Sequence, residues 1–132
     1  MSQPEIMRSA DAISVIKENK TSVDYYIFSE YEIHTNTIPP DSVQEWHSHS
    51  VIEETILITR GQMTFSWKDE AGAVQEQLLQ KGDLVRVGTS LHTFLNRSGQ
   101  DTDFVVFRFI PDGRDKRQQI KNDKTVVSSM FY

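Results

Sequence analysis

Short apolar segments dominate the chain from Asp24 onward and limit what it can fold into. They are rich in Val, Ile, Phe, Tyr and Thr, and Pro, Gly, Asn and Asp separate them. Segments of this composition are typical of β-strands, and the breaks between them are typical of turns. In residues 62–68, apolar and polar side chains alternate, as they do in a strand with one buried face. The pattern excludes a mainly helical fold.

The segments predict about eight strands. Their ranges are 24–38, which is long enough for two strands or one bent strand, 43–49, 54–59, 62–68, 74–79, 84–87, 92–96 and 103–110. Many short strands favour a sandwich or a closed barrel, because both architectures limit exposed strand edges. We therefore predict an all-β fold with little helix, in the form of a single barrel whose interior can hold one ligand.

A chain of 132 residues is long enough for one domain. We expect an N-terminal arm over residues 1–23, the barrel core over residues 24–111 and a C-terminal extension over residues 112–132. Within the arm, Ser9 is a candidate N-cap for a short helix that includes Ile13.

The C-terminal extension ends in apolar side chains. They are Val126, Val127, Met130, Phe131 and Tyr132. We expect this end to pack on the barrel or on a second copy of the chain, and a homodimer is the expected assembly.

The composition limits both the chemistry and the partners. The chain has no cysteine, so any metal site must be built from its four histidines and its carboxylates. A net charge of -5 argues against a nucleic-acid surface, which needs clustered Lys and Arg. The apolar runs are far too short to span a membrane and no secretory signal is visible, so we expect a cytoplasmic protein without a membrane contact. A small-molecule ligand or substrate is the expected partner.

His47 and His49 stand two positions apart in a predicted strand. Side chains alternate along a strand, so both imidazoles would project to one side, about 7 Å apart. The pair can present two metal ligands, and an exposed pair of histidines is the alternative.

Glu53 and Glu54 lie in the otherwise apolar stretch that follows this pair. At least one carboxylate must face the interior if the strand is buried on one side, and a buried carboxylate needs a partner. A divalent cation held by the histidines would be that partner; the alternative is that both glutamates are solvated at the strand mouth. His92, farther along, is a further candidate ligand, although a single histidine after a turn is more often exposed or hydrogen-bonded.

The spacing of these residues resembles the first motif of the cupin family. His47, Ser48 and His49, followed by Glu54 and Gly61, stand at the intervals of that motif, although its leading glycine is missing. The resemblance covers residues from about 43 to 110.

A second set looks like the second cupin motif. It contains Gly82, His92 and Asn96. The family usually has a proline before this loop and a further glycine, where this chain has Gly88 and Ser90. The departures concern the conformation of the loop more than the ligand.

The resemblance implies a double-stranded β-helix, or jelly-roll, barrel that holds one divalent metal ion. The implied metal ligands are His47, His49, Glu54 and His92, and counting back from Gly61 favours Glu54 over Glu53. Cupins use Fe, Mn, Ni, Zn, Co or Cu, and the ligand types alone do not choose among them. No other cofactor is expected.

Glu54, Arg108 and His34 are the candidate catalytic residues. Arg108 would clamp a carboxylate or phosphate if it enters the pocket, and otherwise it lies on an outward face. His34 is a candidate acid or base, and the alternative is a surface histidine.

The expected function is that of a metal-dependent enzyme acting on a small polar or aromatic metabolite, with dioxygenase-type chemistry ahead of two alternatives. One is a redox-neutral isomerase, lyase or decarboxylase, in which the metal polarises a carbonyl group. The other is a cupin that binds a small ligand without turnover.

Overall fold

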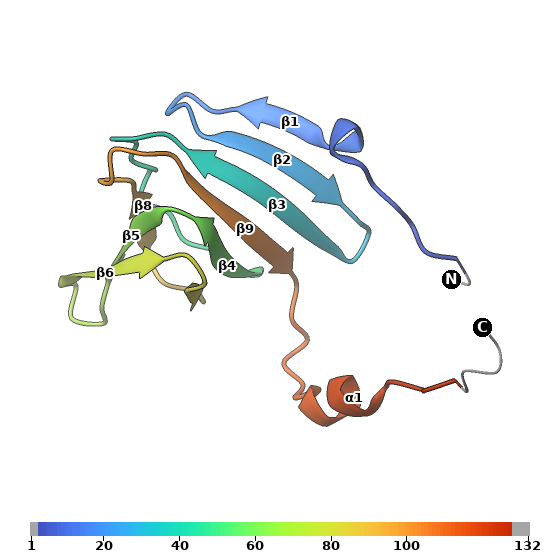
Figure 1. Cartoon of the computed structure of the whole chain (residues 1–132). Helices are drawn as coiled ribbons and strands as arrows, with labels where there is room; N and C mark the ends of the chain where they lie inside the picture. Colours follow the sequence, from blue (N-terminus) through green and yellow to red (C-terminus); the bar gives the residue numbers. More distant parts are fainter. Residues whose placement is uncertain (1–2, 128–132) are drawn as a thin grey trace.

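The computed structural model describes residues 3–127, which form almost entirely β-structure (Figure 1). The elements are η1 (Ser9–Asp11), β1 (Ile13–Ile16), β2 (Ser22–Ile27), β3 (Tyr31–Ile38), β4 (Glu53–Arg60), β5 (Gln62–Lys68), β6 (Val74–Gln80), β7 (Leu84–Arg86), β8 (His92–Leu95), β9 (Thr102–Phe109) and α1 (Arg117–Asn122). The expected all-β fold with little helix is confirmed.

The strands form two antiparallel sheets. The larger has the order β1-β2-β3-β9-β4-β7, and the smaller has the order β6-β5-β8. Their buried apolar side chains form one core cluster, which consists of Ile38, Ile56, Ile58, Met63, Phe65, Leu79, Val87, Phe94, Phe104 and Val106. The alternation predicted from the sequence explains this arrangement, because every second residue of a strand faces the same side.

The N-terminal segment differs from its expected conformation. The predicted short helix is wrong: Ser9–Asp11 is a single 3-10 turn, and Ile13–Ile16 is a strand that pairs with β2. The physical reason is that a run of β-branched residues next to a sheet edge gains backbone hydrogen bonds and loses little by being extended. Part of the segment expected as an arm therefore extends the larger sheet.

Residues 43–49 do not form the continuous strand that their composition predicted. They make isolated bridges to β8, Val43 with Leu95 and His47 with His92. Backbone hydrogen bonds join Gln44 to Phe94 and His47 to His92. The two bonded residues are three positions apart in this segment but only two positions apart in β8. The extra residue interrupts the ladder in the manner of a β-bulge.

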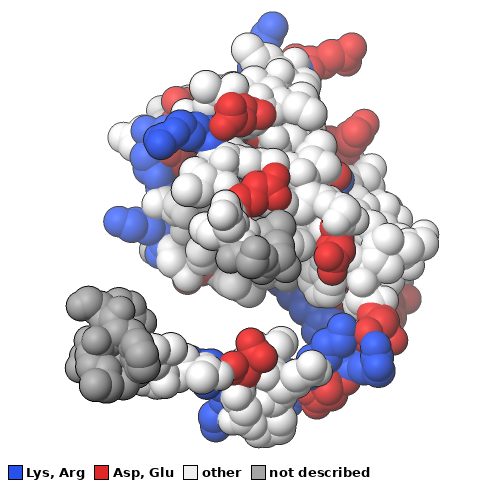
Figure 2. Space-filling model, turned by 90° about the vertical axis from the view of Figure 1, so that its right-hand side faces the viewer, with Lys and Arg blue, Asp and Glu red and all other residues white. Residues whose placement is uncertain are grey.

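After β9 the chain leaves the barrel and continues through α1 along a path away from the sheets (Figures 1 and 2). Its described apolar residues Ile120, Val126 and Val127 are exposed. The predicted packing of Met130, Phe131 and Tyr132 lies outside the described residues. Among residues 3–127, every helix is too short to cross a membrane.

Candidate metal centre

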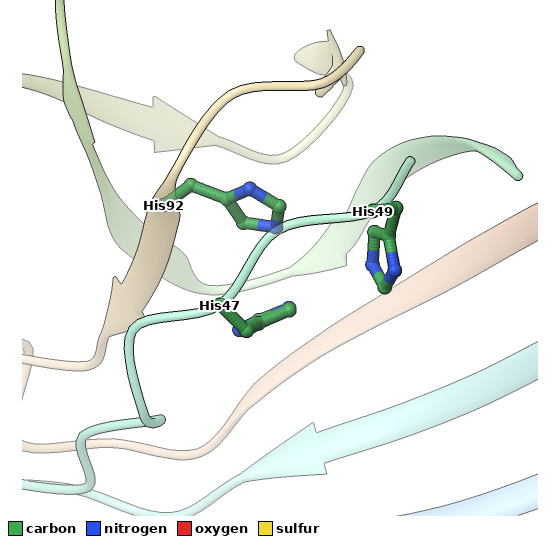
Figure 3. Close-up of side chains that lie close together, drawn as sticks. All are labelled: His47, His49 and His92. Atoms are coloured by element: carbon green, nitrogen blue, oxygen red, sulfur yellow. The ribbon is translucent and has the colours of Figure 1, made fainter. Parts of the chain in front are cut away.

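Three histidines from two distant segments meet in space (Figure 3). His47 and His49 lie between β3 and β4, whereas His92 begins β8. Backbone hydrogen bonds run in both directions between His47 and His92 and hold the segments together. One ligand nitrogen from each ring lies within 4.8 Å of the others. Two nitrogens at about 2.1 Å from one ion are at most about 4.2 Å apart, so small ring rotations would let all three share a cation.

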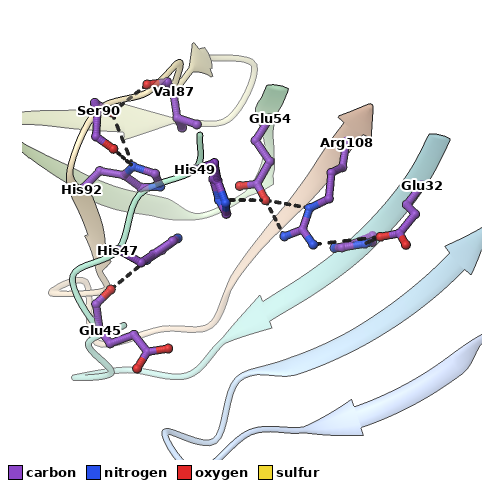
Figure 4. Close-up of polar contacts among 10 residues, drawn as sticks. Glu32, Glu45, His47, His49, Glu54, Val87, Ser90, His92 and Arg108 are labelled. Atoms are coloured by element: carbon purple, nitrogen blue, oxygen red, sulfur yellow. Dashed lines mark hydrogen bonds and ion pairs between the residues drawn. The ribbon is translucent and has the colours of Figure 1, made fainter. Parts of the chain in front are cut away.

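Hydrogen bonds orient two of these rings (Figure 4). The Nδ1 atom of His47 lies 2.9 Å from the carbonyl oxygen of Glu45, and that of His92 lies 2.9 Å from the carbonyl oxygen of Ser90. A carbonyl oxygen can only accept, so each Nδ1 donates and each Nε2 carries a lone pair. This is the tautomer that binds a metal through Nε2.

The free nitrogen atoms fit a metal ion. Nε2 of His49 and Nε2 of His92 are buried, and neither has a hydrogen-bond partner within the described part of the chain. Burial lowers the pKa of His92 below its usual value of 6.5, which favours the neutral, ligating form of the ring. The donor chemistry, the burial and the spacing therefore all suit a divalent cation.

The two glutamates at the start of β4 have different partners. Glu53 accepts a hydrogen bond of 2.9 Å from Arg86, and this bond lowers the pKa of its carboxyl group. Glu54 lines the cavity, and its Oε2 atom lies 3.4 Å from Nε2 of His49. The structure thus places Glu54 beside the histidine cluster, although the cluster itself consists of the three histidines.

Arg108 lies next to Glu54 on the neighbouring strand β9. Its Nε atom donates a hydrogen bond of 2.8 Å to Oε2 of Glu54, and its Nη2 atom donates to the same oxygen (Figure 4). Arg108 lines the cavity, so of the two orientations left open by the sequence the structure shows the inward one. Glu54 occupies the edge of the guanidinium group that would otherwise clamp a substrate anion.

His34 lies in the cavity wall on β3 and is buried. Its Nε2 atom lies 2.8 Å from a carboxylate oxygen of Glu32. Burial is the largest effect on His34 and lowers its pKa below 6.5, even though Glu32 acts in the opposite direction. The ring is therefore neutral near pH 7.

The cluster opens into a cavity of about 680 Å³. Its walls include apolar residues from four strands and the segment before β4, namely Val23, Val43, Ile56, Phe94, Phe104 and Val106. Polar side chains form much of the lining as well. Beside His47, His49, Glu54 and Arg108, they are Lys17, Glu18, Asn19, Tyr25, His34, Asn36, Gln44, Glu45 and Ser48. A cavity of this size with apolar surface and placed polar groups is typical of a small-molecule site.

The sequence interpretation missed several cavity residues, among them Tyr25 and Asn36. A signal for Asn36 was present, because it stands two positions from His34 and shares its face of β3. Tyr25 could not be found in this way, because its position depends on the cross-strand register of β2 with β3.

No family model matches the sequence, and no curated protein matches it either. Solved structures do resemble the fold. A Thermotoga maritima protein described as a predicted oxalate decarboxylase has a TM-score of 0.69 and 16% identity, and the match covers 81% of this chain and 100% of that one.

Two further similar structures are described as cupins. The cupin domain of an XRE family transcriptional regulator from Enterobacter cloacae has a TM-score of 0.57 and 16% identity, covering 69% of this chain and 97% of that one. A sugar phosphate isomerase of a cupin superfamily from Silicibacter pomeroyi has a TM-score of 0.59 and 16% identity, and the match covers 76% of this chain and 70% of that one. At this identity the likeness shows the fold alone, and the chain has the cupin fold that its motifs predicted.

Proposed function

We propose that this cupin-fold chain is a metal-dependent enzyme that acts on a small polar or aromatic metabolite by dioxygenase-type chemistry. One observation carries the proposal: the buried Nε2 atoms of His49 and His92 have no hydrogen-bond partner among the described residues, and one ligand nitrogen from each of these rings and from His47 lies within 4.8 Å of the others. Unpaired buried acceptors are costly, and a bound cation would remove that cost.

His47, His49 and His92 would hold one divalent ion, with Glu54 as the fourth ligand. The Oε2 atom of Glu54, which accepts from Arg108, also lies 3.4 Å from Nε2 of His49, so the carboxylate is beside the three rings. A redox-active ion held by these residues would supply the reactivity toward dioxygen. Fe, Mn, Ni, Zn, Co and Cu all accept imidazole and carboxylate ligands, so the identity of the ion is left to measurement.

The side chains around the ion have separate roles in this proposal. Arg108 holds Glu54 in place and neutralises its charge, because the two groups form a charge-assisted pair. His34 is the candidate base: it is neutral, buried and part of the cavity wall. The apolar part of the cavity wall favours an aromatic or other apolar body on the substrate.

A redox-neutral isomerase, lyase or decarboxylase is the second candidate. The observation that favours it is the neutral His34 in the same cavity as Glu54, because such a pair can move a proton without a change of oxidation state. Two similar structures are described as enzymes of this kind, a predicted oxalate decarboxylase and a sugar phosphate isomerase.

A third similar structure is a domain of a transcriptional regulator. Binding of a small ligand without turnover is therefore the third outcome to be tested.

Anaerobic purification followed by metal analysis and oxygen-uptake assays separates these candidates. The substrate panel contains catechols, diketones and thiols, each tested with the iron-loaded protein and with the zinc-loaded protein as a control. Oxygen uptake with the iron form alone is the result expected for the dioxygenase. A protein that holds only zinc and consumes no oxygen would contradict it.

The assembly we propose is a homodimer formed through the outer face of the larger sheet. Exposed apolar side chains gather on this face, because Tyr31 of β3 pairs directly with Phe109 of β9 and Phe107 lies on the same side of β9. Ile110, which directly follows β9, is also exposed, and so are Ile120, Val126 and Val127 in the C-terminal extension. A second copy would cover both surfaces.

A further inference from the structure

One wall of the cavity contains, beside His34, polar groups that the proposed chemistry does not use. Asn36 lines the cavity and is only 6% exposed, yet its Nδ2 atom has no hydrogen-bond partner in the described part of the chain. A buried amide donor without a partner costs free energy, and native structures seldom keep one without a use. The position of this donor in a cavity wall points to a ligand.

His34 lies beside Asn36 on the same face of β3. The two residues are two positions apart, so their side chains project about 7 Å from each other. The carboxylate of Glu32 accepts a hydrogen bond of 2.8 Å from the Nε2–H group of His34, so in the neutral ring Nδ1 carries the lone pair. Tyr25 on β2 packs edge-on against His34, with ring centroids 4.3 Å apart, and also lines the cavity.

The charged groups that act on His34 already have partners. Arg108 donates two hydrogen bonds to Glu54, and the carboxylate of Glu32 accepts from His34. Burial keeps His34 itself neutral. Lys17 also lines the cavity, but it is exposed to solvent. An anion buried against Asn36 would therefore lack a buried, unpaired cation among the described residues, which is unfavourable.

The neighbours of Asn36 across the sheet are apolar. It pairs with Val23 on β2 and with Phe104 on β9, and both of these side chains line the cavity. A ligand that reaches Asn36 thus passes apolar surface on both sides.

We propose that Tyr25, His34 and Asn36 form a recognition subsite for an uncharged carbonyl or hydroxyl group on an apolar or aromatic substrate. Nδ2 of Asn36 donates to the oxygen of that group, and Nδ1 of His34 accepts from it when the group is a hydroxyl. The inference rests on the proposed function, because it assigns a substrate class to the same cavity. It also assigns specificity, since a carboxylate or phosphate in this position is disfavoured.

Three small probes with the same phenyl body test the subsite: acetophenone, ethylbenzene and benzoate. Acetophenone presents an uncharged hydrogen-bond acceptor, ethylbenzene presents no acceptor, and benzoate presents an anion. Saturation-transfer NMR titrations measure their dissociation constants with the metal-containing protein and with the chelator-treated protein. We expect acetophenone to bind about tenfold more tightly than either of the other probes, because ethylbenzene offers the Asn36 donor no acceptor and benzoate would have to be buried as an anion.

The variant Asn36→Leu removes the donor and keeps the approximate shape of the side chain. We expect the preference for acetophenone over ethylbenzene to fall to about twofold or less, and the Tm to stay unchanged or rise, because an unpaired polar group is replaced by an apolar one. Asn122→Leu, the same change on the exposed helix α1, is the matched control and should keep the wild-type preference.

Several results would overturn the subsite. They are equal affinities for the three probes, no binding of acetophenone at millimolar concentration, an unchanged preference in Asn36→Leu, or a Tm of this variant more than about 5 °C lower, which would assign Asn36 a structural role. The chelator-treated sample separates this inference from the proposed function. A protein that binds no metal but still prefers acetophenone refutes the metal enzyme and keeps the subsite.

Discussion

Glu54 and Arg108 are direct cross-strand partners in the β4–β9 pair, and the guanidinium group donates from both Nε and Nη2 to the Oε2 atom of Glu54. The same oxygen lies 3.4 Å from Nε2 of His49. The carboxylate therefore lies between the histidine cluster and Arg108. A substitution of Arg108 is therefore expected to alter the position of the Glu54 carboxylate beside the histidines.

Removal of a histidine ligand should abolish metal binding and leave the fold intact. We expect His47→Ala and His92→Ala to weaken metal affinity by at least about 100-fold, because each removes one nitrogen of a small donor set. Metal content after dialysis and circular dichroism measure the two effects. His34→Gln, which changes the histidine outside the cluster, should retain the metal. Equal metal content in all three variants would refute the site.

Removal of the Arg108 guanidinium group should destabilise the metal-free protein. Arg108→Met leaves the buried carboxylate of Glu54 without its partner, which costs several kcal/mol for a fully buried pair. The Arg108 side chain is 33% exposed, so we expect a smaller loss of about 1–3 kcal/mol in the free energy of unfolding. Urea titration of the chelator-treated protein measures it.

The matched control for Arg108→Met is Arg86→Met. Arg86 of β7 pairs with Glu53, which lies on β4 beside Glu54, but the side chain of Arg86 is 72% exposed. Solvent screens such a pair, and we expect a loss below about 1 kcal/mol. Losses of the same size in the two variants would count against a special role for the Glu54–Arg108 pair.

The stability of the metal-free protein should fall as the pH drops below 6.5. Burial lowers the pKa of both His34 and His92 from that value. Between 6.5 and each lowered pKa the unfolded chain binds more protons than the folded one, so acid favours unfolding. The stabilisation is fully present above pH 6.5 and is lost as the pH falls through the folded pKa values.

Urea unfolding of the chelator-treated protein at pH values of about 7.5 and about 5.5 measures this effect. We expect a lower free energy of unfolding at the acidic pH and a smaller difference in His34→Gln, which cannot take up the proton. A free energy that does not change between the two pH values in the wild-type protein would contradict the burial effect.

The outer face of the larger sheet should support self-association. We expect a dimer in sedimentation equilibrium, and Phe107→Glu should shift it to a monomer, because it places a charge among exposed apolar side chains. Val74→Glu adds the same charge at an exposed apolar position of β6 in the smaller sheet and serves as the control. A monomeric wild-type protein, or a variant Phe107→Glu that stays dimeric, would refute this interface.

Much of the fold could be predicted from local patterns. The alternation in residues 103–110 predicts that Phe104, Val106 and Arg108 share one face, and all three line the cavity. Gly61 of the first motif has a structural reason as well. Its φ is +79°, and a Cβ atom at this position would lie 2.8 Å from the carbonyl oxygen of Asp101.

The errors came from segments whose conformation depends on a distant partner. Ile13–Ile16 has both helical and extended options locally, and the edge of β2 decides for the strand. In residues 43–49 the composition is that of a strand, but the extra residue opposite β8 breaks the ladder. Neither effect is visible in the local sequence.

The sequence by itself determined the β-fold, the cupin-like spacing of His47, His49, Glu54 and His92, and which residues share a face along a strand. These features depend on strand periodicity and on intervals along the chain. Only the tertiary structure decided that Arg108 pairs with Glu54 and that Asn36 is left without a partner. Hydrogen bonding between side chains depends on register across strands that are far apart in the sequence, and periodicity within one strand does not specify that register.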